Sequence, residues 1–400
     1  MPLILIVLVM LVLLIARAQP STIAASETSP MLPMVSSVPL ALFYRPLSDG
    51  TSVSLVAERF ASAILTHGDE SYRDQLRAAG FKGPILQYLV ANEASGPADL
   101  RDARDVCSQY LHSGNDVSGI AQDFCHALHP HEEAFLHNAA GNRIYSTLSW
   151  QEDSGTRTRY YYLMNPGSTV WRQYFLSQAE KNARQMGYTG LFIDNIDRTL
   201  ERGVGRSANS DGRVREFDSD EAYRRAVEGG LAMLRSRLGH LPLWGNVTTA
   251  YFRPNEGHQF TPYLDAVMNE YFVGLWRGQL PDPALWEAQL SQAEAIIQAE
   301  RAFIAVAQGD QNDLGRLQFA LASFLLVADE RAYFRYTDET TYEQGWMYDD
   351  YRSGLGAPTG KRYRTEQFWQ RDFKCGRVRV DPAGHRGWLE TLGATDGCSN

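Results

Sequence analysis

Short apolar segments recur eight times between residues 40 and 336, and longer stretches with helical patterning lie between most of them. Each apolar segment is nearly continuous in hydrophobicity, which is typical of parallel strands covered on both faces. Parallel strands need a crossover connection, usually a helix, so the alternation predicts an α/β fold. The predicted strands are Leu40–Tyr44, Ile85–Val90, Ala134–His137, Gly190–Asp194, Leu241–Val247, Ala266–Glu270, Ala302–Gln308 and Ala332–Tyr336.

Helices are predicted between the strands from amphipathic periodicity and from residues that begin or end helices. They are Ser54–Leu65, Ala98–Leu111, Ser168–Met186, Asp220–Leu238, Pro283–Glu300 and Leu314–Val327. Strands and helices in this order predict a (β/α)8 TIM barrel. An open doubly wound sheet is the alternative, but no glycine-rich phosphate loop follows the first strand.

Three segments depart from a plain barrel. Residues 92–132, after the second predicted strand, are interpreted as an insertion, and residues 248–264 show no clear helix. Arg371–Pro382 is interpreted as two strands around Gly376. We expect this C-terminal β-hairpin to pack on the barrel rather than to form a second domain.

The amino terminus is predicted to direct export. Leu3–Ile15 is a continuous apolar run, shorter than the roughly 20 residues of a membrane span. The small residues of Ala16-Arg17-Ala18 follow it, so residues 1–18 are interpreted as a signal peptide and the protein as secreted or periplasmic. No basic residue precedes the run, so an uncleaved signal anchor is the alternative. Only in that case do we expect the protein to contact a membrane, through this N-terminal segment. Residues 19–39 are interpreted as a flexible tether, and residues 40–400 as one barrel domain.

The four cysteines are Cys107, Cys125, Cys375 and Cys398, which allow three pairings. An exported protein can keep disulfides, and we favour the short-loop pairs Cys107–Cys125 and Cys375–Cys398. No CxxC sequence occurs, so neither a redox motif nor a zinc knuckle is indicated.

The charge balance restricts the partners. The chain has 38 Lys and Arg against 47 Asp and Glu, a formal net charge of −9, which argues against a nucleic-acid partner. Four histidines lie between residues 126 and 137, but their spacing fits no metal motif such as HExxH, so we predict no metal site. We expect no cofactor and a monomeric protein.

Carboxylates end two of the predicted strands. Functional groups of such a barrel lie at the carboxyl ends of its strands, and Asp194 and Glu270 both end apolar runs there. Asp194 could instead cap a helix, but residues 198–205 look like a loop. Two carboxyl groups suit glycoside hydrolysis, in which one donates a proton and the other attacks or activates water. Asp310 competes with Glu270 for the role of the second carboxylate. Alternatively, Asp310 could cap the helix that begins near Asp313.

Further polar and aromatic residues at the strand ends would suit a sugar. Aromatic rings would give stacking faces, and amide or charged side chains would give hydrogen bonds. Asp197 fits a loop cap or a substrate contact better than a catalyst. The candidate substrate-binding residues are Tyr44, Arg45, Gln87, Tyr88, His137, Asn195, Asp197, Trp244, Asn246, Tyr271, Gln308, Asp310, Arg335 and Tyr336.

Several motifs together resemble a known family. They are Met164-Asn165-Pro166, a helix and Gly190–Asn195 (GLFIDN), with the segment from Ala134 to Gly141 and the terminal RDFKCGRVRVDP. Over residues 40–382 the chain resembles hypothetical glycosyl hydrolase family 15. It is similar in style to endo-α-1,4-polygalactosaminidases and the α-galactosidase clan.

The resemblance implies catalytic acids after strands four and six, with Asp194 as nucleophile or stabiliser and Glu270 as general acid/base. α-Galactosidases have a Lys-x-Asp sequence before their nucleophile and this chain has none, so their retaining mechanism and substrate are not carried over. We therefore expect an exported glycoside hydrolase that acts on a polysaccharide. A non-catalytic glycan-binding barrel that assists polysaccharide handling or export is the alternative, and a metal-dependent barrel hydrolase that uses the histidines is a third reading.

Overall fold

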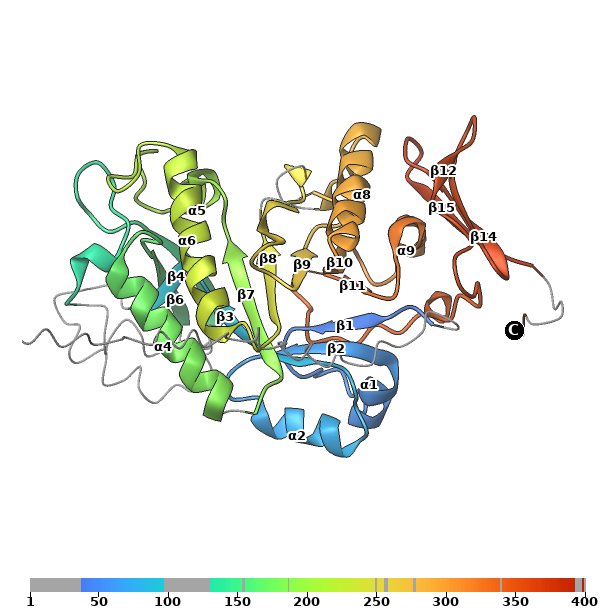
Figure 1. Ribbon diagram of the computed structural model, residues 1–400, viewed down its shortest axis with the longest axis horizontal. Helices are drawn as coiled ribbons and strands as arrows, with labels where there is room; N and C mark the ends of the chain where they lie inside the picture. The colour runs from blue at the N-terminus through green and yellow to red at the C-terminus, as the bar shows by residue number, and fades with distance from the viewer. Residues whose placement is uncertain are drawn as a thin grey trace, which may run out of the picture.

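The computed structural model describes residues 37–96, 130–152, 155–185, 187–248, 250–254, 258–275, 278–338, 340–392 and 398 (Figure 1). The predicted signal peptide, the predicted helix Ala98–Leu111 and the predicted Cys107–Cys125 pair lie outside these residues. Val38 and Pro39, assigned to the end of the tether, are buried, and the Val38 amide donates to the carbonyl of Tyr351 at 2.9 Å.

Eight parallel strands close into a barrel, which confirms the predicted fold class. Around the barrel the order is β1, β2, β3, β7, β8, β9, β10 and β11, and β11 pairs again with β1. The strands are β1 (Leu40–Phe43), β2 (Phe60–Leu65), β3 (Ile85–Val90), β7 (Gly190–Ile196), β8 (Leu243–Val247), β9 (Ala266–Asn269), β10 (Ala302–Gln308) and β11 (Ala332–Thr337).

Two predicted elements are wrong in the first half of the chain. The predicted helix Ser54–Leu65 is a short helix, α1 (Val53–Arg59), followed at once by β2. The backbone becomes extended at Phe60, with φ −96° and ψ 141°, and no glycine or proline marks this change. The predicted strand Ala134–His137 is not a barrel strand; it contains the end of a 3-10 turn, η3 (Glu132–Ala134), and two isolated bridges.

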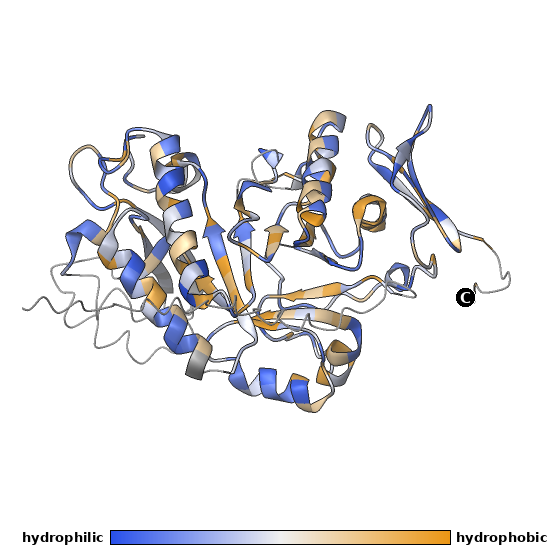
Figure 2. Ribbon diagram, in the orientation of Figure 1, coloured by the Kyte–Doolittle hydropathy of each residue, from blue (hydrophilic) through white to orange (hydrophobic). Residues whose placement is uncertain are grey.

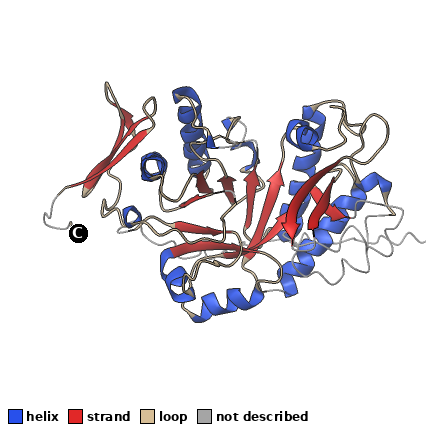
Figure 3. Cartoon of the chain, turned by 180° about the vertical axis from the view of Figure 1, so that it is seen from behind, coloured by secondary structure: helices blue, strands red, loops and turns tan. Residues whose placement is uncertain are grey.

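The insertion follows Val90, as predicted, but β3 is the third barrel strand rather than the second, because β2 precedes it. The insertion also extends beyond residue 132. It forms an antiparallel sheet of β4 (Glu93–Gly96), β6 (Gly155–Leu163) and β5 (Tyr145–Glu152), which lies beside the barrel (Figure 3).

The long helices agree closely with the prediction. Two have the predicted bounds, α6 (Asp220–Leu238) and α9 (Leu314–Val327). Two others are slightly shorter, α4 (Thr169–Gln185) and α8 (Pro283–Gln298). Ser219, Asp282 and Asp313 cap α6, α8 and α9 by accepting from backbone amides.

Four short helical segments complete the described chain. They are α2 (Glu70–Ala78), α5 (Leu200–Arg206) and two 3-10 turns, η4 (His258–Phe260) and η6 (Asp349–Tyr351). α5 replaces the loop expected near residues 198–205. Within the described residues, no helix has the length and apolarity that a membrane span requires.

The C-terminal addition is a four-stranded antiparallel sheet rather than a hairpin. Its strands are β12 (Tyr363–Arg364), β13 (Trp369–Phe373), β14 (Gly376–Asp381) and β15 (Arg386–Thr391). The sheet packs on α9, which is covered on several sides and is therefore mostly hydrophobic (Figure 2). The sheet and the insertion lie at opposite ends of the molecule (Figure 1).

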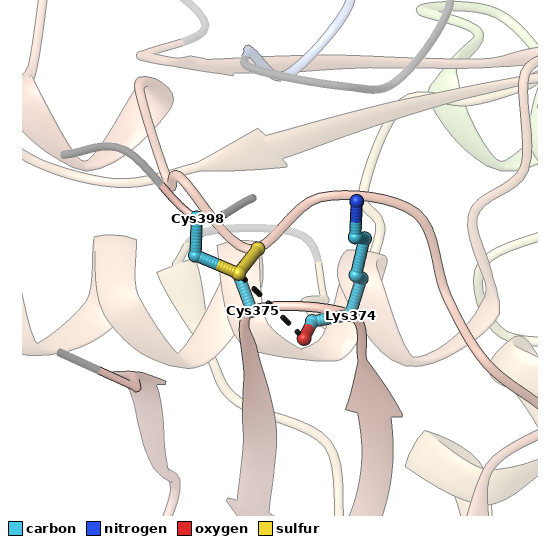
Figure 4. Close-up of a disulfide and its surroundings, with 3 residues drawn as sticks. All are labelled: Lys374, Cys375 and Cys398. Atoms are coloured by element: carbon cyan, nitrogen blue, oxygen red, sulfur yellow. Dashed lines mark hydrogen bonds between the residues drawn. A yellow bond between two sulfur atoms is a disulfide. The ribbon is translucent and has the colours of Figure 1, made fainter. Parts of the chain in front are cut away.

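A disulfide joins Cys375, between β13 and β14, to Cys398, which confirms this predicted pair (Figure 4). It ties the end of the chain to the C-terminal sheet.

Candidate active site

Four polar residues occupy equivalent positions at the carboxyl ends of neighbouring barrel strands. Side chains two positions apart on a strand face the same way. The side chain two positions before each polar residue belongs to the hydrophobic cluster inside the barrel; these side chains are Phe192, Trp244, Met268 and Val306. Alternation therefore directs the later side chains toward the barrel mouth. They are Asp194 of β7, Asn246 of β8, Glu270 directly after β9, and Gln308 of β10.

Asp194 is buried and receives three hydrogen bonds. Its Oδ1 accepts from the backbone amide of Asn195 at 2.8 Å and from Asn246 at 2.9 Å. Its Oδ2 accepts from the hydroxyl of Tyr88. Asn195 has φ +56°, in the left-handed region that Asn tolerates better than most residues, and the pairing of β7 with β8 shifts register here. This local backbone shape brings the Asn195 amide onto the Asp194 carboxylate.

One amide nitrogen connects the two predicted catalytic carboxylates. Nδ2 of Asn246 donates to Oδ1 of Asp194 at 2.9 Å and to Oε2 of Glu270 at 2.8 Å. These distances together limit the separation of the two oxygens to under about 6 Å. The structure thus brings Asp194 and Glu270 to one place.

Glu270 is half-buried and is also held from its other side. The hydroxyl of Tyr342 donates to Oε1 of Glu270 at 2.6 Å, and Nε2 of Gln308 donates to the Tyr342 oxygen at 2.7 Å. Strand position does not predict Tyr342 as a site residue, because it lies five residues beyond the end of β11.

The tyrosines of this site keep their protons. Burial and the neighbouring Asp194 raise the pKa of Tyr88 well above its usual value, and burial and Glu270 do the same to the pKa of Tyr342. Burial also raises the pKa of Tyr44, although the charge of Arg45 opposes it. All three hydroxyls are therefore neutral donors at ordinary pH.

Tyr44 places a half-buried ring beside the carboxylates. It stacks on Tyr88 with ring centroids 5.3 Å apart, and the Arg45 guanidinium lies 5.4 Å from its ring centre. The charges of Asp194 and Glu270 both act on its hydroxyl. Tyr44, Arg45 and Tyr88 thus gather at the site, as predicted from the ends of the first strands.

Asp197 lies three residues beyond Asp194 but is occupied by other partners. It is 2% exposed. Asn92 donates to its Oδ2 at 2.6 Å, and the hydroxyl of Thr248 donates to its Oδ1. These contacts join the segments after β3, β7 and β8, so the observed role of Asp197 is to hold the loops together.

His137 belongs to the insertion. Its Nδ1 lies 2.6 Å from Oε1 of Glu216, and its Nε2 lies 2.7 Å from Oε1 of Glu132. Arg143 binds Glu132 with two nitrogens, at 2.8 and 2.6 Å, and its hydrogen bonding lowers the pKa of Glu132 to about 2. Both ring nitrogens of His137 therefore have carboxylate partners already, and a substrate would have to displace one of them.

Two predicted contacts are buried in the barrel wall. Trp244 is 5% exposed, and its ring packs inside the barrel against Tyr333, with centroids 5.3 Å apart. Gln87 is fully buried and alternates with Leu86 and Tyr88, so it faces the opposite side of β3.

Two residues of β11 support neighbouring loops. Buried Arg335 donates to the carbonyl of Tyr342 at 3.5 Å and to the carbonyl of Gln344. The hydroxyl of Tyr336 donates to the carbonyls of Asp310 and Asp313, at 3.1 and 3.3 Å.

The three remaining predicted residues lie around the site or outside it. Asp310 is exposed, and its Oδ1 accepts from the amide of Asn312 at 2.8 Å, as in a turn; Asp313 caps α9. Tyr271 is buried against Tyr251, with centroids 4.8 Å apart. Asn195 lines a cavity of about 60 Å³ next to α4 and α6.

A metal site is not evident in the part of the chain that the structure describes, where no three His, Cys, Asp or Glu side chains are grouped to hold an ion. His126 and His129 lie outside that part.

Solved structures of similar fold include sugar-active enzymes. The glycoside hydrolase domain of PelA from Pseudomonas aeruginosa is 15% identical over 76% of this chain and 96% of that domain, with a TM-score of 0.45. An alpha-amylase from Malbranchea cinnamomea is 10% identical over 82% of this chain and 76% of the other, also with a TM-score of 0.45.

No curated protein sequence matches the chain. Residues 109–377, more than half of the chain, match the hypothetical glycosyl hydrolase family 15. The chain belongs to this family and is a glycoside hydrolase.

Proposed function

We propose that the protein is exported and cleaves a polysaccharide, with Asp194 as the nucleophile and Glu270 as the general acid/base. The observation that carries this proposal is the amide of Asn246, which donates to both carboxylates. Two carboxyl groups held by one donor at a barrel mouth match the chemical requirement of glycoside hydrolysis.

The hydrogen bonds of Asp194 support its role as nucleophile. A nucleophilic carboxylate must be ionised, and hydrogen bonds to the charged form favour ionisation. Asp194 accepts from Asn195, Asn246 and Tyr88, so three donors stabilise its negative charge although it is buried. The same bonds fix the direction in which its oxygens face.

The position of Glu270 supports its role as acid and base. It is half-buried, and it shares the amide donor Asn246 with Asp194, so it lies where a proton could pass to the leaving oxygen of a sugar bound at Asp194. Glu270 would give its proton to the glycosidic oxygen while Asp194 forms a bond to the anomeric carbon. It would then take a proton from water, whose oxygen displaces Asp194 and releases the sugar.

The separation of the carboxylates supports retention of anomeric configuration. Retaining enzymes hold their carboxyl groups about 5 to 5.5 Å apart, whereas inverting enzymes leave about 6.5 to 9.5 Å for a water molecule. Asn246 keeps one oxygen of each carboxyl group under about 6 Å from the other, which is nearer to the retaining than to the inverting spacing.

Two further features support a sugar substrate outside the cytoplasm. The half-buried ring of Tyr44, stacked on Tyr88 beside the carboxylates, offers a face on which a sugar ring could pack. The disulfide Cys375–Cys398 is of the kind kept in oxidising compartments, which agrees with the predicted signal peptide.

The test is release of reducing sugar from a panel of extracellular polysaccharides. For a polysaccharide that the wild-type chain cleaves, Asp194→Asn and Glu270→Gln should each lower the rate at least about 1,000-fold, because each removes a group used in every turnover. Asp310→Asn is the matched control, since Asp310 is an exposed turn residue, and it should keep the wild-type rate. Near-wild-type activity in either of the first two variants would refute the assignment.

A further inference from the structure

Tyr342 contacts Glu270 directly, yet the mechanism proposed above assigns no role to Tyr342. It follows β11 in a loop, is 8% exposed, and places its hydroxyl between Glu270 and Gln308.

The hydrogen bonds have a definite direction. Nε2 of Gln308 donates to the carbonyl oxygen of Glu270 at 3.1 Å, and a carbonyl oxygen only accepts, so this atom is the amide nitrogen. The same nitrogen lies 2.7 Å from the Tyr342 oxygen, which must accept there. The one proton of the Tyr342 hydroxyl is therefore directed to Oε1 of Glu270, 2.6 Å away.

This direction does not change with the charge of Glu270. Burial raises the pKa of Tyr342 well above its usual value, so the hydroxyl stays protonated while Glu270 gains or loses a proton. Oε1 is thus an acceptor in both states. Oε2, 2.8 Å from the nitrogen of Asn246 that also binds Asp194, lies on the side of the second carboxylate.

We propose that Tyr342 is a positioning residue that keeps Oε1 of Glu270 as an acceptor and so makes Oε2 the oxygen that gives and takes the catalytic proton. This inference rests on the proposed function of Glu270. A protonated Oε2 still has a lone pair for Asn246, while its O–H can point to the leaving oxygen. The proton is thereby held on the side where Asp194 attacks.

The loop that carries Tyr342 is fixed at several points. Buried Arg335 donates to the carbonyls of Tyr342 and Gln344. The amide of Gly345 donates to Oδ2 of Asp49 at 2.6 Å, and the amide of Ser48 donates to the carbonyl of Glu343 at 2.7 Å. These contacts tie the loop to β11 and to the segment after β1, which explains how a loop residue can hold a carboxylate in place.

The first test needs no substrate. The carboxyl group of Glu270 is followed by NMR in the full chain labelled with [5-¹³C]glutamate, and its signal is assigned by its loss in Glu270→Gln. Tyr342→Phe removes a donor to the ionised form, so the signal should titrate about one pH unit higher. Tyr348→Phe removes a hydroxyl six residues away that donates to the carbonyl of Gln311, and it should leave the titration of Glu270 unchanged. An unmoved titration in Tyr342→Phe would overturn the proposal.

The second test uses aryl glycosides of the sugar whose polysaccharide the wild-type chain cleaves. A misplaced acid matters only when the leaving group needs a proton. Tyr342→Phe should therefore lower kcat/KM about 10- to 100-fold for the glycoside whose leaving group is unsubstituted phenol. For the glycoside whose leaving group is a dinitrophenol, the loss should be less than about 3-fold. Tyr88→Phe, which acts on Asp194, should lower both alike.

An equal loss of kcat/KM for both aryl glycosides in Tyr342→Phe would contradict a role in placing the proton. If the wild-type chain cleaves no glycoside, the proposed function fails, while the NMR titration still decides whether Tyr342 controls the carboxyl group of Glu270.

Discussion

At the scale of single residues, the site depends on donors that serve more than one acceptor. Nδ2 of Asn246 donates to both carboxylates, and Nε2 of Gln308 donates to Tyr342 and to the backbone of Glu270. Because Asn246 and Gln308 cannot change charge, they hold the geometry while a proton moves among the groups around them.

Outside the site, Glu132 leads to a prediction on pH. Hydrogen bonding by Arg143 lowers the pKa of Glu132 from 4.5 to about 2 in the folded chain. A lowered pKa contributes stability above pH 4.5, and this is lost as pH falls toward 2. Since the Glu132 side chain is 62% exposed, we expect only about 1 kcal/mol.

The measurement compares the free energy of unfolding of wild type and Glu132→Gln. The deficit of the variant should be present at pH 7 and should shrink between pH 4.5 and 2. A deficit that stays constant over this range would show that the charge of Glu132 is not its cause.

The sequence predicted the site residues that follow from strand position. Asp194, Asn246, Glu270 and Gln308 all lie within two residues of a strand end, and period-two alternation suffices to bring them together. Asp197 and His137 could not be judged in this way, because they lie outside the barrel strands and strand alternation therefore does not predict their partners Thr248 and Glu216. Tyr342 could not be found because loop geometry, rather than periodicity, directs it.

At the scale of elements, the prediction was wrong where no breaker separates two structures. Val53–Arg59 and Phe60–Leu65 are a helix and a strand in direct succession, and together they read as one amphipathic helix. The true second strand was therefore missed, and Ala134–His137 took its place in the count. The other seven barrel strands were found because each is a short apolar run with clear flanks.

The contact between β15 and α9 gives a prediction on stability. A Cβ at Gly387 would lie 2.4 Å from the carbonyl oxygen of Gln318 and 2.6 Å from Cβ of Ala322. Gly387→Ala should therefore force the C-terminal sheet away from α9 and cost about 1 to 3 kcal/mol. Thermal unfolding measures this as a lower Tm.

Gly360→Ala is the control, because a Cβ there meets no atom within 4 Å, and its Tm should match wild type. A wild-type Tm for Gly387→Ala would mean that the close packing of β15 on α9 is wrong.

At the scale of the whole molecule, the barrel lies between two antiparallel additions (Figure 3). The C-terminal sheet is attached through polar contacts as well as packing. Arg362 binds the carboxylates of Glu287 and Glu294 on α8, and Arg371 donates to the carbonyls of Leu325 and Ala328 at the end of α9. These contacts support a sheet that unfolds together with the barrel.

The disulfide extends this attachment to the end of the chain. Cys375 and Cys398 are 23 residues apart, and closing a loop of this length contributes about 3 kcal/mol in the chain-entropy account. The double variant Cys375→Ser with Cys398→Ser should therefore unfold at lower temperature than wild type. Equal Tm values would show that the bond adds no stability.

The central claim is that Asp194 attacks the sugar directly, with Glu270 as acid and base. The most direct measurement is ¹H NMR of the first product released from a polysaccharide that the wild-type chain cleaves, recorded before the sugar equilibrates in water. The account predicts that the new reducing end has the anomeric configuration of the bond that was cut, because two displacements restore it. A first product of the opposite configuration would contradict the account, since it would require a water molecule between the sugar and Asp194.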